Sequence, residues 1–347
     1  MKLKRLFFIL LPALIALLCA CTRQQAMQTD SFYAMNTYIS ITLPQNEKAR
    51  FSSLRRYVED IESTFSRTRT ESDLYRVNHT SVTEVSPVCA DVLLRAQGAA
   101  RTTNGAFNPC LGSIIELWDI TGKAYIPTEE ERTAALAECD PLGYTVEGKT
   151  VTKQNAQTLL DLGAVVKGYA AGELLHTLRE SGIDSALINF GGNVALCGHA
   201  PGRTDGWRVG IKNPFSPDEI ALTLTCTNTV IAVSGDYERY FERDGVRYHH
   251  IFDGSTGKPA ASGLVSCAVV CEDGFTADML STALFVMGKE RAYELWQSGV
   301  YDFEAILFAD DGHVYVTDGL RESVQLVPTA QTQAGVPLVL EKLEETF

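Results

Sequence analysis

The segment from Leu159 to Val316 constrains the fold most, because many short β-rich runs are interrupted there by only two helical patterns. The helical patterns cover Val165–Glu180 and Thr276–Met287. Meandering strands packed with helices favour an α+β fold with mixed, mostly antiparallel sheets over a doubly wound sheet. A hairpin is expected at Asp244-Gly245. The expected strands are Leu159–Leu162, Ala186–Phe190, Val194–Leu196, Trp207–Lys212, Leu222–Cys226, Val230–Val233, Leu264–Val270, Ala305–Phe308 and Val314–Val316.

The first half of the chain adds one strand and three helices to this prediction. Phe32–Leu43 is rich enough in β-branched and aromatic residues to be a strand. Apolar residues at spacings of three and four predict a helix over Phe51–Phe65. Ser86-Pro87 is a typical start for a second helix, which Gly105 ends. Thr128–Ala137 is a third helix with an acidic first turn, as the helix dipole favours.

The N-terminus predicts export and lipid anchoring. Basic residues precede an apolar run from Leu6 to Leu18, which is shorter than the roughly 20 residues of a membrane span and fits a secretory signal. Leu18-Cys19-Ala20-Cys21 is typical of a bacterial lipobox, with cleavage after Ala20 and a lipid on Cys21. We therefore expect a signal over 1–20, a tether over 21–30 and one domain over 31–347, held outside the cytoplasm on the bacterial cell membrane by Cys21. The alternative is an ordinary secreted protein with an incidental cysteine.

Charge and cysteine content exclude several classes of function. The net charge of −13 becomes −16 once residues 1–20 leave, which argues against a nucleic-acid partner. An anionic ligand must then be held by local cations or by a metal ion. Seven cysteines remain after Cys19 and Cys21 are set aside, with no CxxC pair. This pattern argues against a zinc site and against a complete disulfide framework, and most of these cysteines are expected to be buried.

A cluster of acidic and hydroxyl residues lies in the second predicted helix of this segment. Asp278 and Thr282 are four residues apart and so share one helix face. Two hard oxygen ligands on one face suit Mg²⁺, which prefers one or two carboxylates and leaves room for substrate phosphates. The alternative is structural, with Asp278 capping the helix and Thr282 facing solvent or core.

A second candidate site is the glycine turn that leads into the helix from Val165. Backbone N–H groups at a helix start, with the charge of Lys167 nearby, could seat a diphosphate. The alternative is that Asp161 caps the helix and Lys167 is solvated. The segment lacks the GxxxxGK[ST] pattern of a P-loop.

Three further motifs are weaker. His250 lies where a strand ends, and an imidazole there could accept a hydroxyl proton, although Asp253-Gly254 may equally form a turn. Gly191-Gly192 within a strand pattern indicates a bulge or a close approach to a ligand. Ala106-Phe107-Asn108 could offer an aromatic face and an amide to a flavin-like ring, although Phe107 would by default pack in the core.

Taken in order, these motifs resemble the FAD:protein FMN transferase (ApbE) family of bacterial lipoproteins from about Phe32 to Phe308. The stretches that carry the resemblance are AMNTY (34–38), GAFNP (105–109), DLGAVVKGYAAGELL (161–175), LINFGGNV (187–194), SGDYERY (234–240), HIFDGSTG (250–257) and TADMLSTALFVMG (276–288). The resemblance implies an ApbE-type, T-fold-like domain. It implies Mg²⁺-dependent transfer of FMN from FAD to a threonine hydroxyl of an acceptor protein, with release of AMP.

The resemblance also assigns roles to individual residues. It implies that FAD, the substrate, is bound by Met35, Ala106, Phe107, Asn108, Asp161, Lys167 and Ile251. It implies that Mg²⁺ is held by the main-chain oxygen of Ala164 and by Asp278 and Thr282, with Ser281 adjacent. His250 and Asp278 are the implied catalytic residues.

Two positions depart from the family pattern, and two other functions stay open. Asn108 stands where the family has an aspartate, and Asn36 stands where it has a glycine. These changes bear on FAD affinity and on the balance between transfer and hydrolysis. One alternative is an FAD pyrophosphatase that releases FMN and AMP, and the other is a flavin-binding lipoprotein without catalysis.

Overall fold

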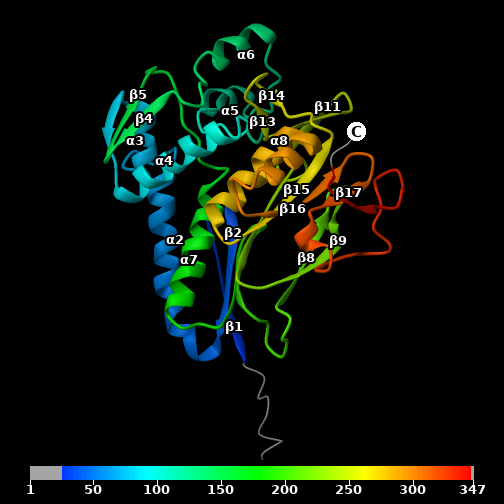
Figure 1. The fold of residues 1–347 in the computed structure, drawn as a ribbon. Helices are drawn as coiled ribbons and strands as arrows, with labels where there is room; N and C mark the ends of the chain where they lie inside the picture. Colours follow the sequence, from blue (N-terminus) through cyan, green and yellow to red (C-terminus); the bar gives the residue numbers. More distant parts are fainter. Residues whose placement is uncertain (1–25, 345–347) are drawn as a thin grey trace, which may run out of the picture.

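The structure is a computed structural model that describes residues 26–344 (Figure 1). Its helices are α2 (Phe51–Phe65), α3 (Asp73–His79), α4 (Pro87–Thr102), α5 (Gly112–Trp118), α6 (Glu129–Leu136), α7 (Val166–Glu180), α8 (Gly274–Ser298) and the 3-10 helices η1 (Gln45–Arg50) and η2 (Asp318–Leu320). The predicted cleavage site and Cys21 lie outside the described residues. Within 26–344, no helix is both long and apolar enough to cross a bilayer.

A nine-stranded sheet organises the molecule. Its order is β1-β2-β6-β7-β10-β15-β16-β17-β19, and every neighbouring pair is antiparallel except β17 and β19. The strands are β1 (Met27–Ala34), β2 (Thr37–Pro44), β6 (Ser185–Phe190), β7 (Asn193–Gly198), β10 (Thr229–Gly235), β15 (Leu264–Cys271), β16 (Glu304–Ala309), β17 (His313–Val316) and β19 (Val339–Lys342). The mixed, mostly antiparallel α+β fold predicted from the sequence is therefore confirmed.

Smaller sheets surround this one. The order β18-β9-β8 is built from β8 (Trp207–Asn213), β9 (Ser216–Cys226) and β18 (Val324–Leu326). The order β3-β5-β4 is built from β3 (Val82–Glu84), β4 (Tyr144–Glu147) and β5 (Thr150–Lys153). Two hairpins pair β11 (Tyr240–Arg243) with β12 (Val246–His249) and β13 (Phe252–Asp253) with β14 (Lys258–Pro259).

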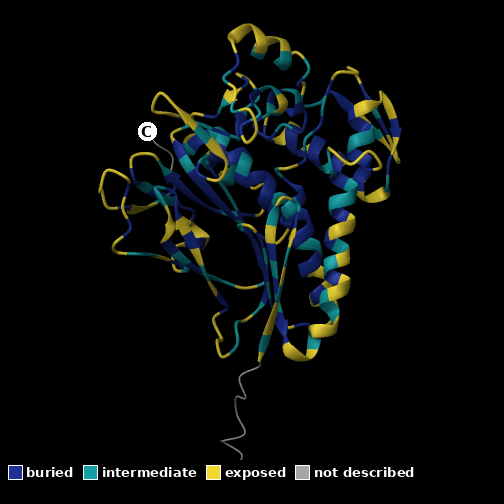
Figure 2. Cartoon of the chain, turned by 180° about the vertical axis from the view of Figure 1, so that it is seen from behind, coloured by how far each residue is buried: buried dark blue, intermediate teal, exposed yellow. Residues whose placement is uncertain are grey.

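The large sheet is covered on both faces, so its central strands are buried. Helices α7 and α8 contact β6, β7, β10 and β15 on one face (Figure 1). Ala195 of β7 belongs to the apolar core on that side, whereas its neighbours Val194 and Leu196 belong to a second core shared with β8 and β9. Successive side chains of a strand point to opposite faces, which explains this division. Figure 2 shows the resulting buried centre.

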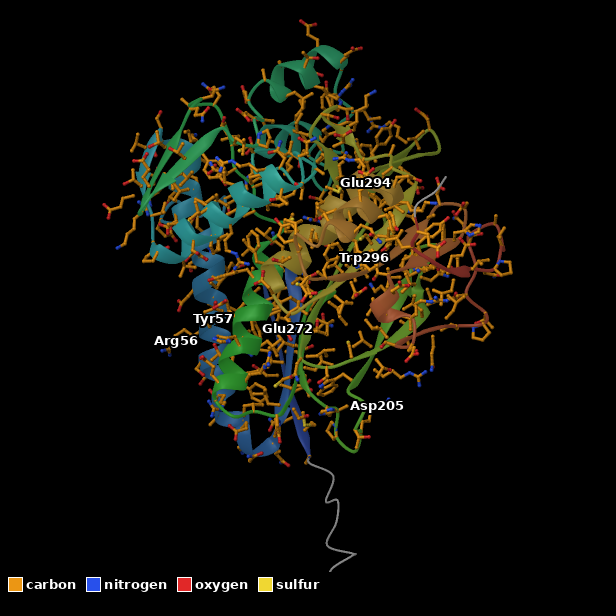
Figure 3. The ribbon with its side chains drawn as sticks, in the orientation of Figure 1. Arg56, Tyr57, Asp205, Glu272, Glu294 and Trp296 are labelled. Atoms are coloured by element: carbon orange, nitrogen blue, oxygen red, sulfur yellow. The ribbon has the colours of Figure 1, made fainter. Side chains whose placement is uncertain are left out.

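Three glycines bring α7 and α8 into close contact. A Cβ atom on Gly168 would lie 2.2 Å from the carbonyl oxygen of Gly274, and one on Gly274 would lie 2.1 Å from that of Gly168. A Cβ on Gly172 would lie 2.9 Å from the Gly274 nitrogen. Helix α2 packs outside α7, where burial and the hydroxyl of Tyr169 raise the pKa of Tyr57 (Figure 3).

Two predictions for the N-terminal region were wrong. Phe32–Leu43 is a hairpin rather than one strand, because Met35 and Asn36 form a turn with φ of 52° and 58°. Asparagine tolerates this left-handed region, so the departure at Asn36 is compatible with a tight turn. Strand β1 begins at Met27, within the segment 21–30 that was expected to be a tether.

Three later predictions also need correction. Leu159–Leu162 is irregular rather than a strand. Gly191-Gly192 is the turn between β6 and β7, with φ of 62° and 120°, rather than a bulge within a strand. The predicted helix end at Met287 coincides with a kink, because Gly288 has a non-helical φ of 78°, but the second helical segment of α8, which continues to Ser298, was not predicted. The remaining predicted helices and strands agree with the structure within a few residues, and the Asp244-Gly245 hairpin is present.

The seven cysteines after Cys21 are all free thiols, and all but Cys226 are buried. They behave as small apolar residues, as predicted.

Candidate functional site

The start of α7 and the second turn of α8 meet at Asp278. The Gly168 N–H donates to Asp278 Oδ2 over 2.8 Å. The Asp278 residue is only 4% exposed, and none of the ion pairs found among residues 26–344 includes it. A buried carboxylate without a direct ion pair is costly, and only the longer-range charge of Arg239 acts on this one, so the position fits a bound cation.

The same hydrogen bond changes what the Ala164 carbonyl oxygen can do. Around it the first turn of α7 is ordinary: Val166 N donates to Leu162 O and Tyr169 N donates to Val165 O. The Gly168 N–H would normally donate to Ala164 O, four residues before, but it donates to Asp278 instead. No hydrogen bond among the described residues uses Ala164 O, which leaves this oxygen available as a ligand.

Hydroxyl groups continue the site along α8. Ser234 Oγ of β10 lies 2.8 Å from Ser281 Oγ and 3.2 Å from Thr282 Oγ1. Ser281 is fully buried and donates to the Asp278 carbonyl oxygen over 2.8 Å, whereas Thr282 is partly exposed. Thr282 is therefore the more accessible of the two predicted hydroxyl ligands. A carboxylate, a hydroxyl and a carbonyl oxygen are the ligand types that Mg²⁺ takes, so these residues fit that ion.

Within residues 26–344, there is no group of three or more histidine, cysteine, aspartate and glutamate side chains that could hold a metal ion.

Asp161 and Lys167 flank the start of α7. Asp161 Oδ1 accepts from Gly163 N over 2.8 Å, and Oδ2 pairs with Arg67 over 2.9 Å. Arg67 also pairs with Glu116, and its buried Nε has no partner. Lys167 Nζ donates to Gly163 O over 3.2 Å, so the turn is held from both ends. Asp161 therefore stabilises the turn before α7 and does not cap the helix, whose N-cap residue is Val165.

The irregular segment before Asp161 is held by two buried side chains. Asn78 Oδ1 accepts from Leu160 N and Asn78 Nδ2 donates to Leu160 O, over 2.8 and 2.9 Å. Lys153 Nζ donates to the carbonyl oxygens of Asn78, Ala156 and Thr158. Burial lowers the pKa of Lys153. These contacts replace the strand pairing that the sequence suggested for this segment.

His250 is held as a neutral imidazole with a defined tautomer. Its Nδ1 lies 3.1 Å from Arg239 O, and because a carbonyl can only accept, Nδ1 carries the proton and Nε2 does not. Burial, followed by the Arg239 charge, lowers the pKa of His250 well below its usual range. His250 is partly exposed, but the protein packed around it makes burial the main cause of its lowered pKa. Neutral His250 can therefore accept a proton at Nε2.

Arg239 and Lys167 link this histidine to the acidic residues. The charge of Arg239 interacts with the carboxylates of Asp161 and Asp278, and that of Lys167 contributes to the lowered pKa of His250. Asp161, Lys167, His250 and Asp278, predicted separately, therefore lie in one electrostatic cluster.

The other predicted cofactor residues are less exposed to a ligand. Ala106, Phe107 and Ile251 are buried. Asn108 Nδ2 donates to Cys139 O and its Oδ1 accepts from Cys110 N, so this side chain supports the loop. Met35 N donates to Glu62 Oε1, and no hydrogen bond within 26–344 joins Met35 to the cluster above.

Sequence reasoning quoted the stretches that contain Arg239, Ser234 and Asn193 but assigned no role to these residues. Asn193 is 2% exposed, and its Nδ2 has no hydrogen-bond partner. Asn193 shares its face of β7 with Ala195, and Ser234 shares its face of β10 with Ala232; both alanines belong to the helix-covered core. The signal was present in the GGN and SGDYER stretches, but a single polar residue in a strand does not show which face it occupies.

Two surface pockets lie elsewhere, at the N-terminal end of α8. Both are lined by Glu272 and Asp273, and neither contains a predicted site residue (Figure 3).

Comparison with known proteins gives one consistent result. Residues 35–307 match the model of the ApbE family. The chain is 35% identical over 265 residues to the FAD:protein FMN transferase of Treponema pallidum, covering 70% of this chain and 72% of the relative. It is 31% identical over 315 residues to the enzyme of the same name from Vibrio cholerae, covering 86% and 93%.

Solved structures agree. The ApbE protein of Thermotoga maritima superposes with a TM-score of 0.77 at 30% identity, covering 85% of this chain and 98% of that one. The flavin transferase ApbE of Vibrio cholerae gives a TM-score of 0.76 at 28% identity, covering 86% and 99%. The sequence match and the shared fold together establish that this chain belongs to the ApbE family.

Proposed function

We propose that this protein is an enzyme that transfers FMN from FAD to a hydroxyl group of an acceptor protein and releases AMP. The observation that carries the proposal is the Gly168 N–H, which donates to Asp278 and so leaves the Ala164 carbonyl oxygen without its helical hydrogen bond. Relatives that share the fold are named FAD:protein FMN transferase, which supports this reaction.

Asp278, Thr282 and the Ala164 carbonyl oxygen would hold Mg²⁺. When bound, the ion would neutralise negative charge on the diphosphate of FAD and on the phosphorus centre as the bond to AMP breaks.

The protein's own residues would perform the remaining steps. Lys167 and Arg239 supply positive charge near the buried carboxylates, in a protein whose overall charge is negative. The acceptor oxygen forms a bond to the FMN phosphorus, the phosphoanhydride bond to the AMP phosphate breaks, and AMP leaves with the electron pair. His250 Nε2 takes the proton of the attacking hydroxyl, since its Nδ1 proton is held by Arg239 O. We propose a threonine as the acceptor residue.

Incubation of the protein with FAD, Mg²⁺ and a co-expressed candidate acceptor tests this proposal. Mass spectrometry should find FMN on a threonine of the acceptor, and its appearance should match the release of AMP. Rapid AMP release without acceptor, and no modified acceptor, would instead indicate an FAD pyrophosphatase. Binding of FAD without either product would indicate a flavin-binding protein.

We also propose that Cys21 carries the lipid that anchors the protein outside the cytoplasm. Cys21→Ser should move the protein from the membrane to the soluble fraction and abolish incorporation of labelled fatty acid. Unchanged membrane association without label would contradict this.

A further inference from the structure

Three hydroxyl groups and one carbonyl oxygen form a continuous hydrogen-bonded chain at the site. Thr282 Oγ1 lies 3.2 Å from Ser234 Oγ, and Ser234 Oγ lies 2.8 Å from Ser281 Oγ. Ser281 Oγ lies 2.8 Å from the carbonyl oxygen of Asp278. The chain joins strand β10 to helix α8, and Ser234 had no assigned role in the site.

The direction of each hydrogen bond follows from the number of protons. A hydroxyl has one proton to donate, and a carbonyl oxygen has none. Ser281 therefore donates to Asp278 O and must accept from Ser234. Because the Ser234 proton is used in that bond, the contact between Ser234 and Thr282 requires Thr282 to donate.

This direction determines what Thr282 presents to the site. The Thr282 hydroxyl proton points to Ser234, so both lone pairs of Thr282 Oγ1 are available to another partner. A metal ion binds the lone pairs of a hydroxyl and is repelled by a proton between them. We propose that Ser234 is a positioning residue that orients the Thr282 hydroxyl for cation binding, an inference that rests on the metal site of the proposed function.

The surroundings keep Ser234 in place. It pairs with Cys267 across the central strands β10 and β15, and its carbonyl oxygen accepts from Ser266 Oγ over 3.1 Å. Ser281 is fully buried, so water cannot replace Ser234 as its donor. Groups that orient metal ligands typically change metal affinity by 10–100-fold when removed.

Titration of the full chain with Mn²⁺ tests the proposal, because Mn²⁺ shares the preference of Mg²⁺ for oxygen ligands and free Mn²⁺ is measured directly by electron paramagnetic resonance. Ser234→Ala should raise the dissociation constant about tenfold. Ser234→Thr, which keeps the hydroxyl, should restore it to within about twofold of the parent. Thr229→Val is the matched control, because it removes a hydroxyl of the same strand that donates to Cys271 O and does not contact Ser234, and it should leave the dissociation constant unchanged.

A double-mutant cycle with Thr282→Val shows whether Ser234 acts through Thr282. Thr282→Val should weaken Mn²⁺ binding, and adding Ser234→Ala should then weaken it no further. Two results would overturn the role of Ser234. One is that the effects of the two substitutions on the Mn²⁺ dissociation constant add fully. The other is that Ser234→Ala binds Mn²⁺ as tightly as the parent while Thr282→Val binds it more weakly. An unchanged constant for Asp278→Ala would instead overturn the metal site, and with it the proposed function.

Discussion

The Gly168 N–H and the Asp278 carboxylate, 110 positions apart in the sequence, form a hydrogen bond of 2.8 Å that joins the start of α7 to α8. This bond replaces the helical bond to Ala164 O and uses one oxygen of a buried carboxylate. One contact therefore joins the two helices and leaves the Ala164 carbonyl oxygen free for the proposed Mg²⁺ site.

Asp278→Asn should separate the structural role of this residue from its chemical role. An asparagine can still accept from Gly168 N through its amide oxygen, but it lacks the negative charge that attracts Mg²⁺. We expect activity to fall at least about 100-fold, as for loss of a group that stabilises the transition state. The melting temperature should change little. FMN transfer and thermal unfolding measure the two effects, and substantial remaining activity would contradict a role in metal binding.

Gly168→Ala should destabilise the protein because its Cβ would lie 2.2 Å from the rigid carbonyl of Gly274. Overpacking of this kind costs about 1–3 kcal/mol of unfolding free energy. Gly172→Ala meets its nearest atom at 2.9 Å and should cost less. In Gly98→Ala, within α4, the new Cβ has no neighbour within 4 Å, so helix propensity should stabilise the protein by up to about 1 kcal/mol. Urea unfolding of the three variants checks this order.

Stability should fall in acid because two adjacent histidines are buried in the neutral form. Burial lowers the pKa of His249 to about 4, and burial also lowers that of His250. An unfolded histidine has a pKa of about 6.5, so between these values the unfolded chain binds more protons. The contribution of the two neutral histidines to the free energy of unfolding is fully present above pH 6.5 and is lost as the pH falls to about 4.

The variant His249→Gln tests the sign of this effect. It removes one of the two titrating groups, so the slope of unfolding free energy against pH between 6.5 and 4 should become shallower, by at most about 3 kcal/mol over the window. Activity should show no loss near pH 6.5 that depends on His250, since His250 stays neutral there. A slope that His249→Gln leaves unchanged would show that this histidine does not titrate as its burial requires.

Asn193→Leu should affect stability and FAD binding in opposite directions. The side-chain Nδ2 is buried without a partner in the ligand-free chain, so an apolar replacement of similar size should leave the melting temperature unchanged or raise it. If that donor serves FAD, the dissociation constant for FAD should rise about 5–100-fold. Fluorescence titration with FAD and thermal unfolding measure both.

Asn189 provides the comparison. Its Oδ1 accepts from Gly192 N over 3.0 Å, so Asn189→Leu should lower the melting temperature and change FAD affinity less than Asn193→Leu does. If Asn193→Leu binds FAD as tightly as the parent, Asn193 has no role in the site.

The sequence predicted best those elements whose pattern is local. Three helices were predicted correctly, from the apolar spacing of Phe51–Phe65, the Ser86-Pro87 start of α4 and the acidic first turn of α6. Leu159–Leu162 was misjudged because the backbone of Leu160 is held by the side chain of Asn78, 82 positions away in the sequence, rather than by a neighbouring strand. The face occupied by Ser234 or Asn193 depends on strand register, and register is set by tertiary pairing that no local pattern contains.

The site residues also divide into those that a local pattern predicts and those that depend on tertiary contacts. The four-residue spacing predicted that Asp278 and Thr282 share a helix face, and the family resemblance assigned them to Mg²⁺. The tautomer of His250 and the freed carbonyl of Ala164 depend on contacts with Arg239 and Asp278, which only the folded chain brings together.

Alkylation of the buried free thiols can be used to measure unfolding of this protein. Burial raises the pKa of Cys89 and Cys267, and neither residue is exposed, so both thiols are protonated and shielded in the native state. Only the thiolate reacts with alkylating reagents. The alkylation rate of Cys267, on a central strand, would therefore follow global unfolding. Stabilisation by bound FAD would appear as slower alkylation, and no engineered probe is needed.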